Sequence, residues 1–258
     1  MENTFLSKLN IEQFLKANFQ EILVLKETSS TNDVAKELAL KGVNSAIVVS
    51  ESQTNGRGRL NREFYSPKDK GVYLSVLLRP NIKLKNAPKI TAFCGVCVAR
   101  AIESLASVKV GIKWVNDLFI NGKKVGGILT ESAINGETRT LDYVVIGIGV
   151  NVFDDKYPDF IKDIATNIQK ESGAIVNKNE VIAQIVNNLA GIESAVSNNL
   201  FLEEYKQRQI VLNKQIKVVT LNEEFYCTAI DIDENGNLIV SNSTAVQTIT
   251  AGDVSIRM

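Results

Sequence analysis

Two kinds of hydrophobic pattern follow one another along this chain of 258 residues, and their junction limits the folds it can adopt. Before about residue 212, short apolar runs of strand length alternate with longer segments of helical periodicity. From about residue 213, only short strand-like runs follow. The sequence therefore predicts an α+β chain with two domains. Residues 1–212 would form a mixed sheet with packed helices, and residues 213–258 a small β-barrel.

The first domain is expected to alternate strands and helices. Strands are expected at residues 21–25, 46–50, 72–78, 109–114, 118–120, 123–131 and 143–152, and helices at residues 32–40, 87–107, 178–197 and 201–209. Ser30 and Thr31 are suited to cap the helix at 32–40, with Asp33 at the third position after Ser30. Asn121-Gly122 separates two strand-like runs and predicts a two-residue hairpin turn.

The second domain is expected to contain only short strands. They are expected at residues 215–221, 225–232, 238–242 and 245–249, and Asn235-Gly236 predicts a turn between two of them. Short strands at this spacing are typical of a small barrel, in which closure protects the edge strands. The pattern therefore predicts an all-β unit joined to the end of the α/β part.

The overall charge of the chain gives no sign of a large charged partner. Lysine and arginine together number 29, as do aspartate and glutamate, so the formal net charge is zero. A neutral protein has no general attraction for nucleic acid or anionic membranes. The N-terminal residues lack the pattern of a secretory signal, and no apolar run approaches the roughly 18 residues that span a membrane. We therefore expect neither a nucleic-acid nor a membrane partner.

The histidine and cysteine content limits the chemistry that the chain can perform. There is no histidine, which excludes histidine-based catalytic pairs and metal sites. Three cysteines are an odd number and argue against a disulfide framework, so a cytoplasmic location is expected. Cys94 and Cys97 lie in an apolar helical stretch. Buried packing is their expected role, with redox or metal chemistry as the alternative.

One segment carries an unusual density of arginine. Residues 54–70, which we call the arginine loop, contain Gly56-Arg57-Gly58-Arg59 and Arg62 and have little hydrophobic periodicity. Glycine lets the backbone approach a ligand, and guanidinium groups bind carboxylate and phosphate oxygens through paired donors. Taken alone, the segment fits an anion-binding loop, a solvated basic loop or an RNA-binding patch. Phe64 and Tyr65 beside it could stack on a base.

Three strand segments contain further candidate residues. Lys113 shares a strand face with Gly111, and a buried ammonium needs a partner or a function; the alternative is a packed stem with a solvated charge. Gly126-Gly127 indicates a bulge or the close approach of another backbone. Gly147-Ile148-Gly149 lacks the third glycine of a dinucleotide motif, and the chain contains no Gly-x-x-x-x-Gly-Lys phosphate loop. A bound nucleotide would therefore need a different kind of site.

Taken together, these segments resemble the biotin protein ligases from about residue 22 onward. Single motifs are weak, but six motifs in the family's order and spacing carry the resemblance. They are Thr28-Ser29-Ser30-Thr31-Asn32, Gln53 with Gly56-Arg57-Gly58-Arg59, Ser66-Pro67, Lys113-Trp114-Val115-Asn116-Asp117, Gly126-Gly127-Ile128-Leu129 and Gly147-Ile148-Gly149-Val150-Asn151. The ending Ala251-Gly252-Asp253-Val254-Ser255-Ile256-Arg257 is similar to the family's last strand. The resemblance implies a core like that of the class II synthetases, followed by an SH3-like barrel.

The resemblance also implies a two-step reaction. Biotin and Mg-ATP give biotinyl-5′-AMP and pyrophosphate, and the biotinyl group then passes to one lysine of a biotin carboxyl carrier protein. By motif position, the residues implied for biotin are Ser30, Thr31, Asn32, Gln53, Arg57, Gly58, Arg59 and Lys113, and those implied for ATP are Arg59, Arg62, Phe64, Asn116 and Asn151. Lys113 and Arg57 are implied as catalytic, because cations must offset the repulsion between a carboxylate and a phosphate. The sequence does not identify the Mg²⁺ ligand, and Asp117 is a candidate.

Three positions depart from the family pattern. Val115 stands where the family usually has proline, Asn61 where it usually has glycine, and Phe64 where it often has tryptophan. Valine also favours a strand, and asparagine tolerates left-handed backbone better than most residues, so the local backbone is expected to be kept. Phenylalanine keeps a stacking face with less area, so weaker adenylate binding is expected.

Further expectations concern the N-terminus, the loop and the alternatives. Only about 27 residues precede Thr28, whereas a winged helix-turn-helix needs roughly 60, so a ligase without a DNA-binding repressor domain is expected, as monomer or homodimer. The arginine loop is expected to be mobile when empty and ordered by an anionic ligand. The alternatives are a lipoate or octanoyl ligase of related core fold and a non-enzymatic RNA-binding protein. The arginine loop and barrel argue against the first, and the neutral charge against the second.

Overall fold

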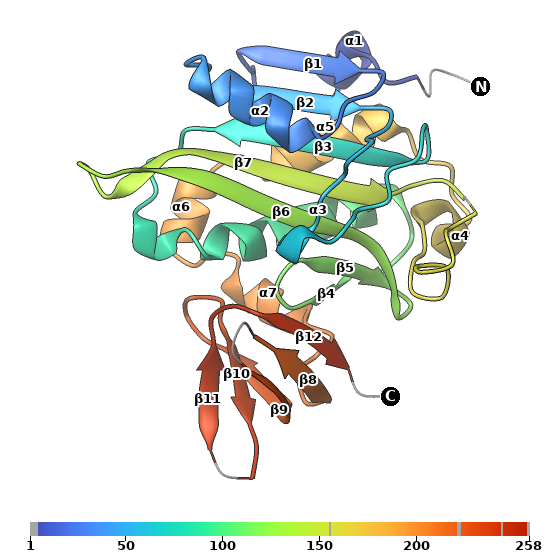
Figure 1. Cartoon of the computed structure of the whole chain (residues 1–258). Coiled ribbons are helices and arrows are strands. Elements are labelled where there is room, and N and C mark those ends of the chain that lie inside the picture. The colour runs from blue at the N-terminus through green and yellow to red at the C-terminus, as the bar shows by residue number, and fades with distance from the viewer. Residues whose placement is uncertain (1–4, 155, 221–222, 244, 257–258) are drawn as a thin grey trace.

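The larger part of the molecule is built on a seven-stranded mixed sheet. The computed structural model describes residues 5–154, 156–220, 223–243 and 245–256. The strand order is β1-β2-β3-β7-β6-β5-β4, in which β1 and β2 are parallel and all other neighbours antiparallel (Figure 1). The strands are β1 (Glu21–Leu25), β2 (Ala46–Ser50), β3 (Gly71–Leu78), β4 (Gly111–Lys113), β5 (Asp117–Ile120), β6 (Lys123–Asn135) and β7 (Thr140–Asn151). The predicted mixed sheet is confirmed.

Helices cover both faces of this sheet. They are α1 (Lys8–Glu12), α2 (Thr31–Leu40), α3 (Lys89–Leu105), α4 (Ile168–Ser172), α5 (Lys178–Asn188), α6 (Ile192–Ser197) and α7 (Leu202–Gln207), with short 3-10 turns η1 (Arg59–Asn61) and η2 (Leu84–Asn86). α2 joins the parallel strands β1 and β2 and lies on one face, whereas α3, α5 and α6 lie on the other (Figure 1). No helix in the described ranges is both long and apolar enough to span a membrane.

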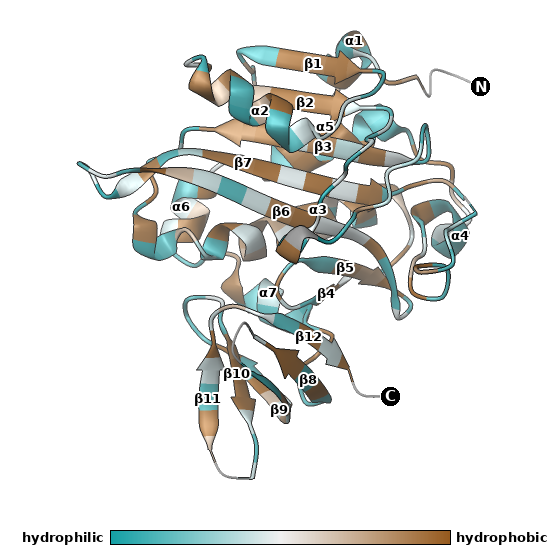
Figure 2. Cartoon of the chain, in the orientation of Figure 1, coloured by the Kyte–Doolittle hydropathy of each residue, from teal (hydrophilic) through white to brown (hydrophobic). Residues whose placement is uncertain are grey.

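The centre of the sheet is its most hydrophobic part. Figure 2 shows hydrophobic residues along β2, β3 and β7, and all five residues of β2 are buried. A strand covered on both faces reads as a nearly continuous apolar run. α2 covers one face through a small cluster that includes Ala35 and Val145, and the main core lies on the other face around α3. Cys94 and Cys97 are free thiols in that core, so their predicted packing role is confirmed, and burial raises the pKa of Cys97 to about 12.

The predicted helices differ from the structure in two places. A single helix at 178–197 is wrong, because α5 ends at Asn188 and α6 begins at Ile192, after Gly191 at a left-handed φ of 74°. Glycine adopts this conformation without the strain that a side chain would add, and so permits the break. The predicted helix at 87–107 is shortened to α3. The sequence predicts no helix at α1 or α4, each of which is too short for a periodicity to show.

Two hairpin turns shape the end of the sheet near β4. Asn121 and Gly122 have positive φ angles of 49° and 79°, so the predicted two-residue turn between β5 and β6 is confirmed. β4 is shorter than predicted and ends at Lys113. Residues 114–116 form a turn in which the peptide bond between Trp114 and Val115 is cis. Val115 therefore lies in a turn and does not extend the strand as expected.

The remaining strands form a separate C-terminal sheet, β8–β12. They are β8 (Gln215–Val219), β9 (Glu224–Ile232), β10 (Leu238–Ser241), β11 (Val246–Ile249) and β12 (Asp253–Ile256). The order is β11-β10-β9-β8-β12, and all neighbours are antiparallel. The described strands therefore pair as an open series with β11 and β12 at its edges, where the sequence predicts a closed barrel. The turn predicted at Asn235-Gly236 joins β9 to β10, whereas residue 221 of the predicted 215–221 strand and Arg257 lie outside the described residues.

The C-terminal sheet is anchored below β4 and α7 (Figure 1). The indole Nε1 of Trp114 donates a hydrogen bond of 3.0 Å to the Gly236 carbonyl, in the turn between β9 and β10. Asn199, just before α7, donates through its Nδ2 to the Glu234 carbonyl of the same turn at 3.0 Å. These bonds fix the C-terminal sheet next to the residue that follows Lys113.

Candidate active site

A cavity of about 790 Å³ opens on the face of the large sheet that carries α2. Its walls are the start of α2, the arginine loop, the β4–β5 turn, β6 and β7, residues 160–165 and Asp253. All twelve residues implied for biotin or ATP line this cavity: Ser30, Thr31, Asn32, Gln53, Arg57, Gly58, Arg59, Arg62, Phe64, Lys113, Asn116 and Asn151. The structure thus brings together residues from four separate segments of the sequence, at 30–32, 53–64, 113–116 and 151.

The start of α2 forms a wall of buried polar groups. Ser30, Thr31 and Asn32 are each at most 4 % exposed. The Ser75 hydroxyl of β3 lies 2.7 Å from Thr31 Oγ1 and 2.6 Å from Asn32 Oδ1. Asn32 Nδ2 donates to Glu131 Oε2 at 2.7 Å. Buried partners on the sheet therefore fix the orientation of these side chains at the cavity wall.

Glycines on β7 make room for two side chains of the cavity walls. A Cβ at Gly147 would lie 2.3 Å from Asn32 Oδ1, and a Cβ at Gly149 would lie 2.4 Å from the ring of Phe64. Contacts this short do not occur, so any side chain at either position would displace its neighbour. The two glycines of the Gly-Ile-Gly sequence therefore permit the close approach of Asn32 and Phe64.

Gln53 connects the start of α2 to the arginine loop. Its Oε1 accepts hydrogen bonds from the Thr31 N–H at 2.9 Å and the Thr31 hydroxyl at 3.1 Å. Its Nε2 donates to Ser66 Oγ at 3.0 Å, and the Ser66 hydroxyl donates to the Phe64 carbonyl at 2.9 Å. Because both ends of the carboxamide are bonded, Gln53 has one orientation and couples the position of Phe64 to that of Thr31.

The arginine loop holds its shape through its own backbone. The Phe64 N–H donates to the Gly56 carbonyl at 2.8 Å, and the Gly58 N–H donates to the Arg62 carbonyl at 2.7 Å. Leu60 has a left-handed φ of 55° in this turn. The turn is therefore tight at a residue that carries a side chain.

Arg57 is tied to α2 by a network of ion pairs. Its guanidinium donates to both carboxylate oxygens of Asp33, at 2.9 and 2.5 Å, and Lys36 lies 3.0 Å from Asp33 and 2.9 Å from Glu131. The hydrogen bond from Arg57 holds the pKa of Asp33 below its ordinary value. The predicted capping role of Asp33 is wrong, because its carboxylate binds these cations, and Ser30 makes no side-chain capping bond either.

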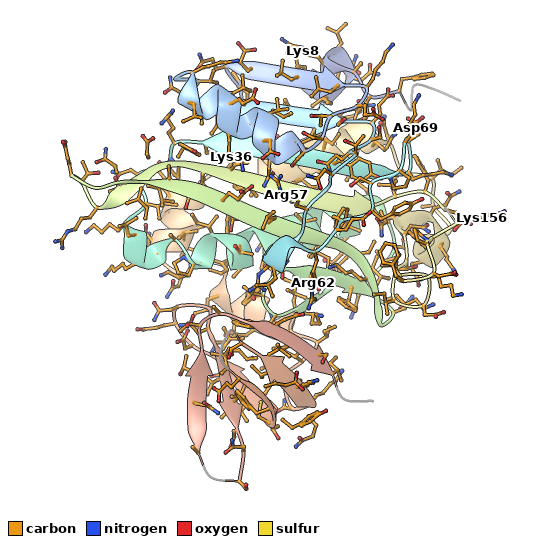
Figure 3. All side chains as sticks on the ribbon, in the orientation of Figure 1. Lys8, Lys36, Arg57, Arg62, Asp69 and Lys156 are labelled. Atoms are coloured by element: carbon orange, nitrogen blue, oxygen red, sulfur yellow. The ribbon has the colours of Figure 1, made fainter. Side chains whose placement is uncertain are left out.

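Arg59 and Arg62 reach from the loop to the C-terminal sheet. Arg59 donates to the Gly252 carbonyl at 2.9 Å and to Asn116 Oδ1 at 3.3 Å, whereas Arg62 lies 2.5 Å from the Asp253 carboxylate. Figure 3 shows Arg57 over the middle of the large sheet and Arg62 nearer to the C-terminal sheet. Both oxygens that accept from Arg59 are neutral, so its charge is left to attract an anionic ligand.

Two lysines share one carboxylate at the β4–β5 end of the cavity. Asp117 Oδ1 lies 2.7 Å from Lys124 Nζ, and Asp117 Oδ2 lies 3.4 Å from Lys113 Nζ. The Lys113 ammonium also lies 5.7 Å from the centre of the Phe119 ring. The side chain of Lys113 is 17 % exposed and faces the cavity. The alternative interpretation, a packed stem with its charge in solvent, would have placed the ammonium on the outer surface. Two positive charges against one negative charge leave this end of the cavity positive.

Two asparagines are fixed at the walls between these clusters. Asn116 Nδ2 donates to the Ile128 carbonyl at 2.9 Å, and Asn151 Nδ2 donates to the Thr166 carbonyl at 3.0 Å. Each bond uses the amide nitrogen, so the amide oxygen of Asn116 is directed at Arg59. The two side chains are therefore arranged before any ligand binds.

Several residues of the cavity escape the sequence analysis. Lys124 stands two residues before Gly126-Gly127, and the alternation of β6 could have placed it near Lys113. Phe160 lies in a segment without a motif, and Asp253 lies in the last strand, to which the sequence assigned no role in the site; only the folded chain brings both to the cavity. The sequence therefore finds the residues that motifs mark and misses those that tertiary contacts contribute.

The cavity does not contain a preformed metal cage. The described part of the chain holds no cluster of three cysteine, aspartate or glutamate side chains that could bind a metal ion. Asp117, the candidate ligand, is already paired with Lys113 and Lys124. Mg²⁺ that enters with a nucleotide takes most of its ligands from phosphate and water and only one or two carboxylates from the protein. The carboxylates at the cavity fit an ion that enters with the nucleotide.

Comparison with known proteins places the chain in a family. Residues 24–151 match the biotin/lipoate A/B protein ligase family, and residues 211–257 match the biotin protein ligase C terminal domain. The bifunctional ligase/repressor BirA of Bacillus subtilis (strain 168) is 34 % identical over 249 residues, which cover 92 % of this chain and 74 % of the relative. The chain belongs to the biotin protein ligase family.

Other biotin protein ligases are similar over nearly their whole length. The biotin–acetyl-CoA-carboxylase ligase of Paracoccus denitrificans is 29 % identical over 240 residues, 90 % of this chain and 98 % of the relative. A biotin protein ligase from Aquifex aeolicus, solved in complex with biotin and ATP, has a TM-score of 0.78 at 26 % identity, over 93 % of this chain and 99 % of that one. The predicted family and fold class are confirmed. The lipoate-ligase alternative fits less well, because the match at 211–257 is to the biotin ligase domain.

Proposed function

We propose that the chain forms biotinyl-5′-AMP from biotin and ATP and transfers biotin to one lysine of a biotin carboxyl carrier protein. The observation that carries this proposal is the change in polarity along the cavity. Neutral hydrogen-bonding side chains gather at the start of α2, and cationic side chains gather at the arginine loop and the β4–β5 turn. The first group suits a ureido ring, and the second suits a carboxylate that meets phosphates.

The neutral end supports binding of the ureido ring of biotin. The ring presents one carbonyl acceptor and two N–H donors, and an enclosed site must offer a partner to each. Ser30, Thr31, Asn32 and Gln53 supply hydroxyl and amide groups there. The Ser30 hydroxyl makes no capping bond to its helix, so it is available to the ring.

The cationic end supports the first chemical step. An oxygen of the biotin carboxylate attacks the α-phosphorus of ATP, a carboxylate–phosphorus bond forms, and pyrophosphate leaves. Because two anions must approach one another, fixed cations lower the barrier. Lys113 and Arg57 are the proposed catalytic residues, and the position of Lys124 beside Asp117 adds it to them.

The nucleotide is proposed to occupy the part of the cavity nearest the C-terminal sheet. Arg59 and Arg62 would bind phosphate oxygens, Phe64 would offer a face to adenine, and Asn116 and Asn151 would supply amide groups. Mg²⁺ that enters with ATP would neutralise part of the phosphate charge. The smaller ring of Phe64, compared with tryptophan, leads us to expect weaker adenylate binding.

The second step transfers biotin to the carrier protein. The ε-amine of the acceptor lysine attacks the carbonyl carbon of biotinyl-AMP, an amide bond forms, AMP leaves, and the amine releases a proton. The arginines and lysines that faced the phosphate in the first step also stabilise AMP as the leaving group. The same cavity therefore serves both steps.

The proposal is tested by incubating the purified chain with biotin, Mg-ATP and a biotin carboxyl carrier domain. We expect AMP release and a mass increase of the carrier at one lysine. Lys113→Ala and Arg57→Ala should each slow labelling at least about 100-fold, the scale on which loss of one transition-state partner acts. Labelling with lipoate in place of biotin would support the alternative, and unchanged labelling by both variants would overturn the residue assignment.

The compartment, the domain limits and the oligomeric state of the ligase are also proposals. Its three cysteines are free and buried, which is consistent with a reducing compartment such as the cytoplasm. We propose domain limits at 1–212 and 213–258, and a monomer or homodimer that sedimentation would distinguish. We propose no nucleic-acid partner, since the net charge is zero.

A further inference from the structure

The strand that carries Lys113 is short and has an unusual outer neighbour. β4 is three residues long, pairs with β5 on its inner side, and gives way to a turn directly after Lys113. On its outer side, the Ile112 N–H donates to the Arg208 carbonyl at 2.7 Å, and the Ile210 N–H donates to the Ile112 carbonyl at 3.0 Å. Residues 208–210, which lead to the C-terminal sheet, therefore take the place of a further strand.

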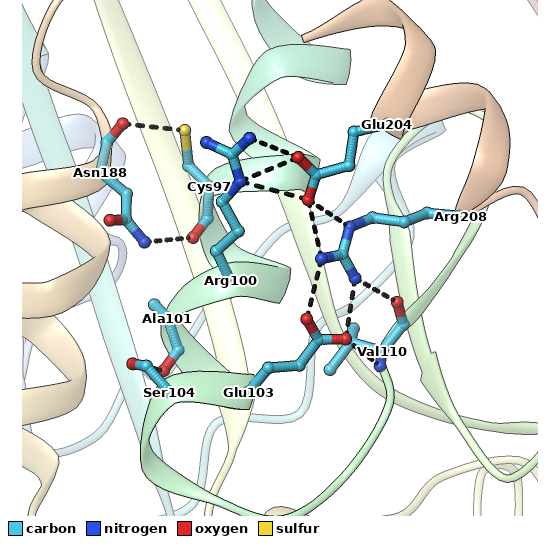
Figure 4. A network of polar contacts seen from close by, with 9 residues as sticks. All are labelled: Cys97, Arg100, Ala101, Glu103, Ser104, Val110, Asn188, Glu204 and Arg208. Atoms are coloured by element: carbon cyan, nitrogen blue, oxygen red, sulfur yellow. Dashed lines mark hydrogen bonds and ion pairs between the residues drawn. The ribbon is translucent and has the colours of Figure 1, made fainter.

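The side chain of Arg208 holds the residue directly before the same strand (Figure 4). Nη1 and Nη2 each donate to one oxygen of Glu103 on α3, both at 2.8 Å, and Nε donates to Glu204 Oε1 at 2.8 Å. Arg208 Nη1 also donates to the Val110 carbonyl at 3.1 Å, and the Val110 N–H donates to Glu103 Oε1 at 2.8 Å. Both backbone polar groups of Val110 are thus held by this charged pair.

The pair is largely shielded from solvent. The side chains of Arg208 and Glu103 are 16 % and 25 % exposed. Removal of one member leaves the charge of the other without its partner in this partly buried place. Burial alone would raise the pKa of Glu103, but the hydrogen bonds from Arg208 and Val110 outweigh it and lower the pKa below its ordinary value. The geometry is therefore maintained at neutral pH.

We infer that Arg208 and Glu103 are positioning residues for Lys113. Their side chains fix Val110, directly before the strand of Lys113, and the backbone carbonyl of Arg208 fixes Ile112 within it. Neither residue lines the cavity. A misplacement of a catalytic group by about 1 Å costs on the order of 100-fold in rate. The inference rests on the proposed function, because it assigns Lys113 to the attack on ATP.

A matched pair of arginines in the same network tests this role. Arg100 also binds Glu204, but its side chain is 52 % exposed, and within the described part of the chain it makes no hydrogen bond to Glu103 or Val110. We call the contacts among Arg208, Glu103 and Val110 the clamp. Arg208→Lys keeps the charge and loses the paired donors, and Arg100→Lys makes the same change outside the clamp. We expect Arg208→Lys to lower kcat for biotinyl-AMP formation about 10-fold with KM for biotin within about 2-fold, and Arg100→Lys to change neither beyond about 2-fold.

A double-mutant cycle separates positioning of Lys113 from general damage. If Arg208 acts through Lys113, then Arg208→Lys adds less than about 2-fold to the loss already caused by Lys113→Ala in single-turnover assays. If the two losses multiply, the inference is overturned. Glu103→Gln provides the same cycle should Arg208→Lys fail to fold.

A second readout does not depend on activity. Lys113 is modified with acetic anhydride in the free protein, and its labelling is measured by mass spectrometry. We expect Arg208→Lys to raise the labelling rate of Lys113 about 3-fold and Arg100→Lys to leave it unchanged, since looser strands expose their side chains. Equal rates in both variants would count against the clamp. A wild-type chain that makes no biotinyl-AMP would instead overturn the proposed function, which keeps the two failures distinct.

Discussion

At the scale of single residues, the shape of the cavity depends on glycines that leave room for neighbouring side chains. Gly147 and Gly149 on β7 have no Cβ, and Asn32 and Phe64 lie where those atoms would be. In a well-packed interior, an added methyl group must displace its neighbour, at a cost of about 1–3 kcal/mol. A substitution at Gly147 or Gly149 should therefore change ligand binding indirectly, because it displaces Asn32 or Phe64.

Gly149→Ala tests this dependence. The new methyl group would push Phe64 off the strand, so we expect the affinity for ATP to fall about 10-fold, which corresponds to about 1.4 kcal/mol. Gly136→Ala is the control, because a Cβ at Gly136 meets no atom within 4 Å. Isothermal titration with ATP in the presence of biotin measures the effect. If both variants bind ATP equally well, Phe64 does not form the adenine face of the cavity.

At the scale of elements, local patterns predict what local forces determine. The two-residue turn at Asn121-Gly122 and the buried strand β2 follow from turn chemistry and apolar runs, and both are present. The break at Gly191 is not visible in a periodicity that continues through it. β4 is shorter than its apolar run because the turn after Lys113 and the bonds to residues 208–210 limit it. Contacts between segments far apart in the sequence therefore determine where such an element ends.

The clamp formed by Arg208, Glu103 and Val110 should make the free energy of unfolding depend on pH. The pKa of Glu103 is below its ordinary value of 4.5 in the folded chain, so its contribution to folding is fully present above pH 4.5 and is lost as pH falls through the lowered pKa. We expect Glu103→Gln to be less stable than wild type at pH 7, and the difference to shrink as pH falls below about 4. Urea unfolding at pH 7, 5 and 3.5 measures it. A difference that grows toward acid pH would contradict the assigned role of the Arg208 pair.

The arginine loop offers a prediction about order. Its turn is held by the hydrogen bonds from Gly58 to Arg62 and from Phe64 to Gly56, while Arg62 is 67 % exposed on its side chain. An anionic ligand would bind several guanidinium groups together and so oppose local opening. We expect trypsin to cleave after Arg57, Arg59 or Arg62 in the free chain and cleavage to slow at least about 5-fold with biotin and Mg-ATP. Equal cleavage in both states would show that the ligand does not order the loop.

At the scale of the whole molecule, the cavity is completed by parts that are far apart in the sequence. Arg59 binds the Gly252 carbonyl and Arg62 binds Asp253, so the C-terminal sheet contributes to the wall. The order and spacing of motifs predicted residues that the fold brings to one cavity, because that order is a property of the family. The ion partners of the arginines could not be predicted, since a charged side chain does not reveal which distant carboxylate or carbonyl will face it.

Because their partners differ, Arg59 and Arg62 are expected to contribute unequally to the affinity for ATP. Arg59 donates to neutral oxygens, so its full charge is available to phosphate, whereas Asp253 already compensates the charge of Arg62. We expect Arg59→Met to weaken ATP binding about 10-fold or more and Arg62→Met less than about 3-fold, because ATP must compete with Asp253 for Arg62 and has no anionic competitor for Arg59. Titration at 50 and 200 mM salt should also show a weaker salt dependence for Arg59→Met alone. The reverse order of effects would mean that Arg62 leaves Asp253 when ATP binds, and that the C-terminal sheet releases the loop during catalysis.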